Sequence, residues 1–143
     1  MHYKTGYIAA LDTKTMNMTR NALGWFEIPV TDFDRARKFY SAIFDFEMPV
    51  YEFGPDGKMG VLLHEQGKGV GGAIFSSPKH RVAPNESGTI VYLDTTPDMD
   101  TVLRRITEAG GRITMPKMSV PGTGAYAVFI DSEGNQVGLF EQA

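Results

Sequence analysis

The sequence contains no cysteine among its 143 residues. Disulfide bonds, thiolate zinc sites and cysteine nucleophiles are therefore excluded together. Histidine is scarce, with single copies at His2, His64 and His80. No run approaches the roughly 18 consecutive apolar residues of a membrane-spanning helix, and the start lacks the apolar core of a signal peptide. These absences predict a cytoplasmic protein without a membrane partner.

The charge balance lacks a basic excess. Fourteen Lys and Arg residues stand against seventeen Asp and Glu residues, which gives a net charge of −3 and a pI near 5.6. Nucleic acid is thereby disfavoured as a partner, because binding its backbone requires clustered cations. A hydrophobic fraction of 42% with 22% charged residues is typical of a folded chain, and the length suits one domain.

The first residues contribute little to this expected domain. Met16 and Met18 are alternative translation starts, and the apolar stretch at residues 7–11 ends at once in Asp12. We therefore expect residues 1–21 to be an N-terminal extension without fixed structure, followed by a single domain over residues 22–143.

An internal repeat organises that domain. Asp-apolar-Asp occurs at residues 32–34 and again 66 residues later at 98–100, each time opening an amphipathic stretch. Thr31 is the expected N-cap of the first helix. Thr96 is the expected N-cap of the second, with Pro97 at its first position and Gly110-Gly111 after its end. The spacing of apolar residues predicts a helix in each stretch.

Each predicted helix follows one apolar strand and precedes three more. The expected strands are residues 25–30, 48–53, 59–64 and 72–76 in the first half, and 90–95, 112–115, 126–131 and 136–141 in the second. The pattern predicts an α+β fold of two tandem βαβββ modules, residues 22–77 and 88–143, with a linker at 78–87.

Strand alternation predicts which side chains share a face. Phe26, Ile28 and Val30 should lie under the first helix, and Trp25 and Glu27 should point the other way. By the same rule the helix side of the second module takes Val91, Leu93, Val137 and Leu139, and its opposite face takes Ile90, Tyr92, Asp94, Gln136, Gly138 and Phe140. We expect the two halves to form curved mixed sheets whose second faces enclose a cavity.

Residues 26–40, FEIPVTDFDRARKFY, resemble the opening module of the vicinal oxygen chelate superfamily. This superfamily includes glyoxalase I, bleomycin-resistance proteins and extradiol dioxygenases. Residues 90–111 and 127–135 are similar to its closing module, although Ser132 stands where the family usually has proline. The resemblance implies paired modules around a cavity and a homodimer.

The resemblance also implies four positions at which metal-dependent members hold a divalent ion. They correspond here to Trp25, Gly72, Gly138, and either Ile90 or Val91. None of these residues offers the carboxylate oxygen or imidazole nitrogen that such ions require. We therefore expect no metal site and no cofactor.

Two residues are candidates for acid–base chemistry. Glu27 shares a strand face with Trp25 and can act as a base or orient a polar ligand group; the alternative is a paired or solvated carboxylate. His64 ends a predicted strand near the expected cavity mouth; the alternative is an exposed histidine without a function.

Several aromatic residues are candidates for an apolar ligand site, although plain core packing is the alternative. The predicted ligand-binding set is Trp25, Glu27, Tyr51, Phe53, Gly72, Ile90, Tyr92, Gly138 and Phe140. The predicted function is the binding of a small, partly apolar molecule without the family's metal site, and whether the protein is an enzyme stays open. The alternatives are a metal-dependent lyase or dioxygenase, and a structural or partner-binding dimer with a filled cavity.

Overall fold

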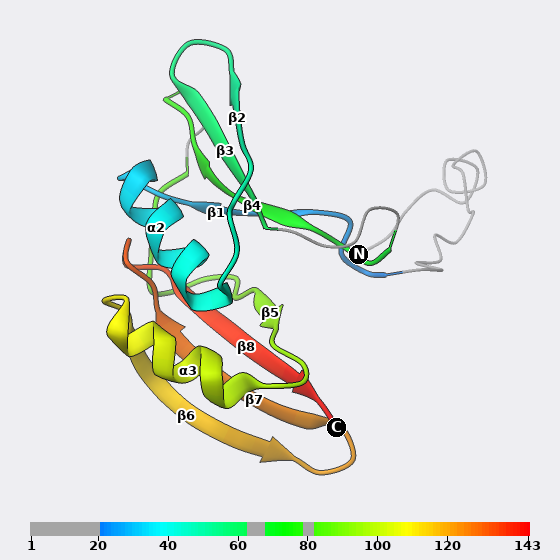
Figure 1. Ribbon diagram of the computed structural model, residues 1–143. Helices are drawn as coiled ribbons and strands as arrows, with labels where there is room; N and C mark the ends of the chain where they lie inside the picture. Colours follow the sequence, from blue (N-terminus) through cyan, green and yellow to red (C-terminus); the bar gives the residue numbers. More distant parts are fainter. Residues whose placement is uncertain (1–20, 63–67, 79–81) are drawn as a thin grey trace, which may run out of the picture.

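The computed structural model describes residues 21–62, 68–78 and 82–143. The first half contains β1 (Phe26–Pro29), α2 (Phe33–Phe44), β2 (Val50–Phe53), β3 (Gly57–Leu62) and β4 (Gly72–Ser76). The second contains β5 (Tyr92–Asp94), α3 (Met99–Glu108), β6 (Arg112–Val120), β7 (Gly124–Ile130) and β8 (Gln136–Gln142). The predicted α+β fold of two tandem βαβββ modules is confirmed (Figure 1). The predicted N-terminal extension lies, apart from Asn21, outside the described residues.

The two modules have the same sheet topology. Each is a four-stranded mixed sheet, in the orders β1-β4-β3-β2 and β5-β8-β7-β6. The first strand of each module pairs in parallel with the last, and the other pairings are antiparallel. β1 and β5 are therefore edge strands, and they lie where the two sheets approach each other (Figure 1).

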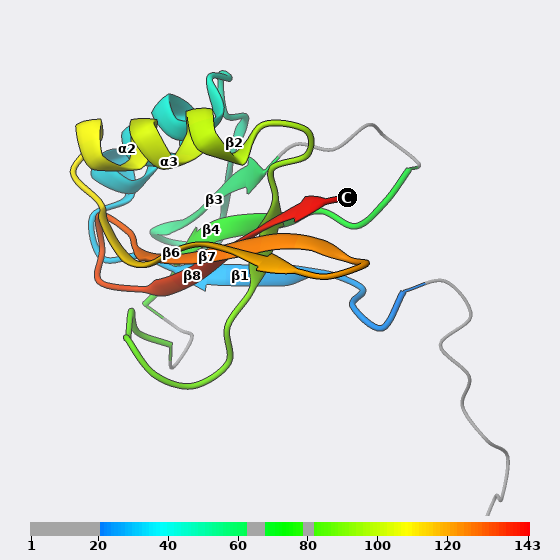
Figure 2. The same ribbon diagram turned by 90° about the horizontal axis from the view of Figure 1, so that it is seen from below.

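Both helices lie side by side on the same side of the sheets (Figure 2). The core forms between these helices and the facing strands, and both modules contribute to it. It includes Ile28, Val30, Leu93, Val137 and Leu139, as strand alternation predicts. The opposite faces of the sheets do not close around a common cavity, because Trp25 and Tyr92 are 43% and 46% exposed there. The two curved sheets of a single chain therefore stay open on this side, and one chain alone does not enclose the expected cavity.

The helices begin one or two residues later than the threonine caps predict. Asp32 is the N-cap of α2, and its carboxylate accepts a hydrogen bond from the Arg35 amide at 3.0 Å. Asp98 caps α3 in the same way through the Thr101 amide at 3.1 Å. The predicted caps Thr31 and Thr96 are wrong because an aspartate stands close after each threonine and reaches the amide three residues on. Pro97 consequently precedes α3 rather than opening it.

Strand lengths also differ from expectation. β6 runs to Val120, five residues beyond the predicted end, because two bulges carry its pairing with β7 past Pro116. Trp25 and Ile90 lie just outside β1 and β5. No helix in the described part of the chain is long and apolar enough to cross a membrane.

A buried polar cluster joins the two modules. The carboxylate of Asp131, at the end of β7, accepts hydrogen bonds from the Tyr40 hydroxyl at 2.8 Å and the Asn135 side-chain amide at 3.0 Å. It also accepts from the backbone amides of Glu133 and Asn135. Because Tyr40 belongs to α2, this cluster fixes the β7–β8 turn of the second module against the first.

Glu133 in the same turn completes the start of α2. One carboxylate oxygen accepts from the amides of Thr31 and Asp32, and the other accepts from Arg35 Nε at 2.6 Å. A carboxylate there also favourably meets the positive end of the helix dipole. The second module thus supplies an acceptor that the first helix needs.

The junction between the modules, formed by the contacts of Tyr40 with Asp131 and of Glu133 with the start of α2, predicts how stability depends on pH. Burial first, and then the charge and hydrogen bond of Asp131, raise the pKa of Tyr40 well above its ordinary value. Partial burial alone would raise the pKa of Glu133, but hydrogen bonds from Arg35 and from the Asp32 and Thr31 amides lower it. The Tyr40 contribution is complete below about pH 10 and lost as pH rises further; the Glu133 contribution is complete above about pH 4.5 and lost as pH falls.

We therefore expect the free energy of unfolding, measured by urea titration, to fall at both ends of the pH range. Tyr40→Phe should flatten the alkaline limb and leave the acidic limb unchanged. An alkaline limb of equal slope in that variant would show that another group causes it.

Candidate functional site

A cleft of about 890 Å³ lies between the first module and the edge strand β5. This size falls within the range of roughly 300–1,000 Å³ that is usual for small-molecule sites. Its walls come from the residues before β1, the end of α2, the end of β3, the segment before β4, and β5. The lining residues are Asn21, Ala22, Leu23, Phe26, Phe44, Phe46, Leu62, Lys68, Gly69, Val70, Gly71, Gly72, Tyr92, Leu93 and Asp94.

Glycine shapes the wall that precedes β4. Gly69 has a φ of +75°, a conformation that side chains disfavour, and it turns the chain toward β4. A Cβ atom at Gly72 would overlap the ring of Phe26, so the absence of a side chain lets that ring lie across the strand. The glycine-rich stretch therefore brings backbone and an aromatic ring together at the cleft.

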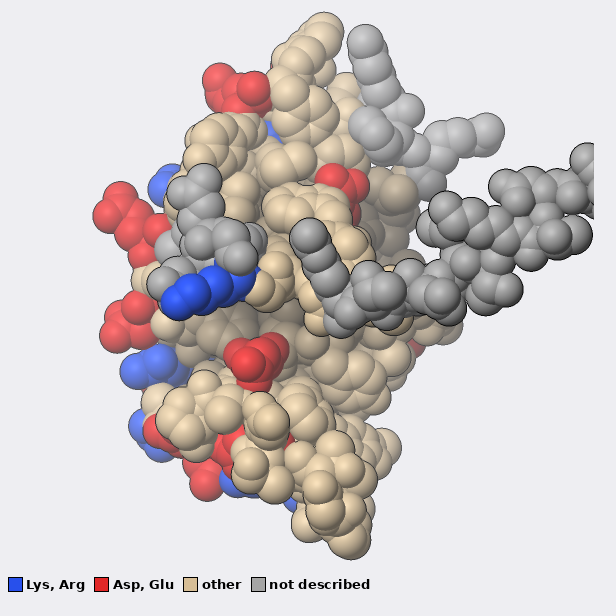
Figure 3. Space-filling model, turned by 90° about the vertical axis from the view of Figure 1, so that its right-hand side faces the viewer, with Lys and Arg blue, Asp and Glu red and all other residues tan. Residues whose placement is uncertain are grey.

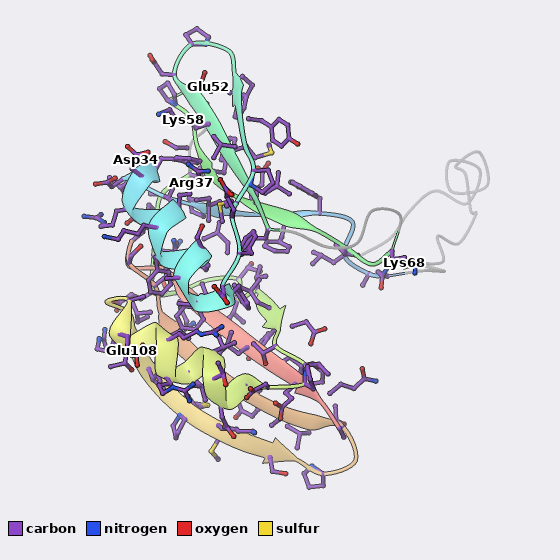
Figure 4. The ribbon with its side chains drawn as sticks, viewed as in Figure 1. Asp34, Arg37, Glu52, Lys58, Lys68 and Glu108 are labelled. Atoms are coloured by element: carbon purple, nitrogen blue, oxygen red, sulfur yellow. The ribbon has the colours of Figure 1, made fainter. Side chains whose placement is uncertain are left out.

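The charged residues in the cleft lining are Lys68 and Asp94. Asp94 is held in place because one carboxylate oxygen accepts from the Thr96 amide at 3.0 Å and the Thr96 hydroxyl at 2.6 Å. Lys68 lies at the right of Figure 4, on the segment before β4, away from the other labelled side chains. On the face that Figure 3 shows, most charged side chains lie along the left side, and much of the other described surface is uncharged. The cleft therefore offers apolar walls with one cation and one anion.

The predicted site residues of the first module lie mainly on the second face of its sheet. Trp25 Nε1 donates to Glu27 Oε2 at 3.3 Å, so these two side chains share a face as predicted. Tyr51 is 60% exposed, and Phe53 stacks on Phe75 with ring centroids 5.5 Å apart. All of them line an open sheet surface rather than the cleft.

The predicted residues of the second module behave in the same way. The Tyr92 ring lies over Gly138, where a Cβ would overlap it, and meets Tyr126 edge-on at 6.4 Å. Phe140 is half-buried and stands beside Tyr126 in the β7–β8 register. Ile90 is half-buried just before β5. Tyr92 also lines the cleft, which places it at the meeting point of the two surfaces.

Gly72 does not share the face of Trp25 and Glu27. Its partner in β1 is Phe26, which packs toward the core, whereas Glu27 pairs with Ala73. In the second module Tyr92 pairs with Gly138, so Ala73 rather than Gly72 is the counterpart of Gly138. The first and last strands of the modules therefore repeat after 65 residues, while the helix caps Asp32 and Asp98 repeat after 66. The extra residue lies between β5 and α3, and the uniform 66-residue offset caused the misplacement.

The comparison with known families gives a direct match. The sequence fits the family model of the Glyoxalase/Bleomycin resistance protein/Dioxygenase superfamily over residues 22–139. The chain belongs to this superfamily. A search of curated proteins finds no match.

Solved structures of the superfamily share the fold. TnmS3, an antibiotic binding protein from Streptomyces sp. CB03234, is 23% identical with a TM-score of 0.59, and the match covers 89% of this chain and 100% of that one. A glyoxalase/bleomycin resistance protein/dioxygenase domain from Frankia sp. EAN1pec is 17% identical with a TM-score of 0.64, covering 87% and 99%. The fosfomycin resistance protein FosX from Listeria monocytogenes is 16% identical with a TM-score of 0.59, covering 88% and 94%.

The metal positions of the glyoxalase superfamily do not fit a metal in this chain. Trp25 and Gly138 lie on the second faces, Ile90 precedes β5, and the fourth position is Ala73 by register. None of these side chains is a ligand for a divalent ion. Among residues 21–62, 68–78 and 82–143, no group of three or more His, Cys, Asp or Glu side chains is placed to hold a metal. His64 lies outside the described residues.

Sequence reasoning missed most of the cleft. Phe44 is the last residue of α2 and Phe46 follows it closely, and neither was among the predicted site residues. Leu62 and Val70 lie on either side of the segment that the structure does not describe. Their convergence depends on how β5 approaches the first module, which no local pattern encodes.

Proposed function

We propose that this protein binds a small, partly apolar molecule in the cleft between its two modules, without a divalent ion at the family's metal positions. The observation that carries this proposal is the cleft itself, which combines aromatic walls with Lys68 and Asp94. Such an apolar cavity with few polar groups is the usual anatomy of a small-molecule site. The antibiotic-binding and fosfomycin-resistance proteins of the same fold support it at the level of fold alone. We place the protein in the cytoplasm.

Dye binding tests the cleft. The anionic aromatic dye anilinonaphthalene sulfonate should bind the native protein saturably, with enhanced fluorescence. Val70→Trp puts a large ring into the cleft and should weaken this binding at least about fivefold, the equivalent of roughly 1 kcal/mol. Val120→Trp is the matched control, because Val120 is also half-buried but ends β6. Equal dye binding by both folded variants would place the apolar site elsewhere.

A metal-dependent lyase or dioxygenase is the alternative of a different class. Elemental analysis that found about one tightly held divalent ion per chain would favour it. A purified protein without stoichiometric metal that still binds the dye would favour the binding function. Glu27 remains the candidate for acid–base chemistry, since its carboxylate lies on an open face beside Trp25.

We also propose that the protein is a homodimer. The outer strands β2 and β6 expose Tyr51, Met115 and Met118 in the single chain, and an exposed apolar sheet surface favours association. Closed two-fold symmetry is the commonest arrangement of identical chains.

Light scattering should therefore give about twice the chain mass of 15.8 kDa at micromolar concentration. Met118→Lys should shift the protein toward the monomer, because it would place a charge in the contact. Val82→Lys, at an exposed apolar position off the sheets, should leave the mass unchanged. A monomeric mass for the unaltered protein would contradict the proposal.

A further inference from the structure

The edge of β5 that faces the cleft has backbone groups without a strand partner. On the other side, the residues that flank β5 bond to β8. The Val91 carbonyl accepts a hydrogen bond from the Gly138 amide at 2.8 Å, and the Thr95 amide donates one to the Phe140 carbonyl at 2.7 Å. Backbone N–H and C=O groups point to alternate sides along a strand, so those of residues 91, 93 and 95 point toward β8. The N–H and C=O groups of Tyr92 and Asp94 therefore point away from the sheet, into the space that the cleft occupies.

β1 presents a second open edge toward the same space. Val30 N donates to Phe75 O at 3.0 Å, which assigns residues 26, 28 and 30 to the β4 side. The backbone groups of Glu27 and Pro29 therefore point away from β4. For Pro29 a contact confirms this direction, because its carbonyl accepts a hydrogen bond from Asn135 Nδ2 of the second module at 2.7 Å. The backbone groups of Glu27 have no partner strand on that side.

The two edges run in opposite directions and diverge. Pro29 lies against Asn135, which precedes β8 and so stands near the beginning of β5. At the other end, Phe26 shares the cleft with Tyr92, Leu93 and Asp94. We call the space between these two open edges, which includes the cleft, the wedge; an added strand there meets backbone donors and acceptors.

Side chains on the two sides of this wedge differ in character. Toward the helices, the cleft is lined by Phe26, Phe44, Phe46 and Leu62. On the opposite side two acidic residues flank the wedge: Asp94 on β5 lines the cleft, and Glu27 on β1 lies beside it on the open sheet face. Lys68, on the segment before β4, adds a cation to the cleft lining.

We propose that the cleft takes an extended, amide-bearing molecule, a short peptide or peptide-like compound, which adds as a strand to the open edge of β5. Its apolar groups would alternate with basic groups, the apolar ones toward the helices and the basic ones toward Glu27 and Asp94. This inference rests on the proposed binding function and specifies its ligand class. Main-chain hydrogen bonds supply affinity in strand addition, and alternate side chains supply selectivity.

Two peptides test the backbone contribution. The probe is fluorescein-labelled Leu-Lys-Leu-Lys-Leu with a free carboxyl terminus, and the control is the same peptide with N-methylated backbone amides. Fluorescence polarisation should show the unmodified peptide binding at least about tenfold more tightly, because N-methylation removes several donors. Equal affinities would overturn strand addition, and retained dye binding in the same sample would leave the proposed function standing.

A matched pair of variants tests the edge itself. Tyr92→Pro removes the outward N–H of β5 and leaves its bonds to β8, since proline is tolerated where the amide faces away from the sheet. Tyr92→Ala removes the same ring and keeps the N–H. The alanine variant should retain the preference for the unmodified peptide, and the proline variant should bind it roughly fivefold more weakly than the alanine variant does.

If both variants bind alike, the β5 edge is not the contact and the proposal is overturned. The two-peptide comparison on the unaltered protein decides the matter if the proline variant does not fold. Failure of the unmodified peptide to bind or to compete, with a dimer that Tyr92→Pro dissociates, would assign the edge to a second copy of the chain instead.

Discussion

Asp131→Ala is expected to lower the free energy of unfolding by about 3–5 kcal/mol, because it removes the acceptor of a buried polar cluster. The Asp131 carboxylate is 4% exposed and accepts from Tyr40, the Asn135 side chain and two backbone amides. Each of these donors would lose its partner in a site that water reaches poorly. Urea unfolding at neutral pH and fixed protein concentration measures the effect.

Asp100→Ala is the matched control for this prediction. Asp100 also carries a carboxylate, but its side chain is largely exposed and its contact with Lys117 Nζ is 3.4 Å. Its removal should change stability by less than about 0.5 kcal/mol. If Asp131→Ala is as mild as this control, water replaces the lost carboxylate and the junction is not a buried cluster.

Phe129→Ala should cost a similar amount, about 3–5 kcal/mol, by leaving a cavity in the shared core. Phe129 in β7 is fully buried, and its ring lies 6.1 Å from that of Phe39 in α2. The contact therefore joins the core of the second module to the helix of the first. Unfolding should remain one cooperative transition, recorded alike by circular dichroism and by Trp25 fluorescence.

Phe53→Ala provides the comparison, since Phe53 is half-buried and stacks on Phe75 away from the helices. It should cost clearly less than Phe129→Ala. Two separate transitions in the Phe129 variant would show that the modules fold independently, contrary to the shared core.

The repeat and the alternation of the strands could be predicted because they depend on local physics. Apolar residues such as Ile28 and Leu139 recur with the period of the element that buries them, so the modules, helices and buried faces follow from sequence. The caps were misassigned because Thr31 and Asp32 are both good caps by type. Only the backbone geometry selects the aspartate.

The candidate site was less predictable because it depends on register and on the approach of distant elements. A one-residue difference in offset moved the predicted position from Ala73 to Gly72, and such a shift exchanges the two faces of a strand. The cleft joins Phe46 to Tyr92, which belong to different modules. Sequence periodicity gives faces within a sheet, but not the distance between two sheets.

The bond between Arg35 and Glu133 has a consequence for biosynthesis. The two residues are 98 positions apart, so the acceptor at the start of α2 does not exist when that helix leaves the ribosome. At roughly 5–20 residues per second, the delay is on the order of 5–20 seconds. During this interval the apolar side of α2 has no second module to pack against. Nascent chains should therefore present a chaperone-binding surface until the last residues are made.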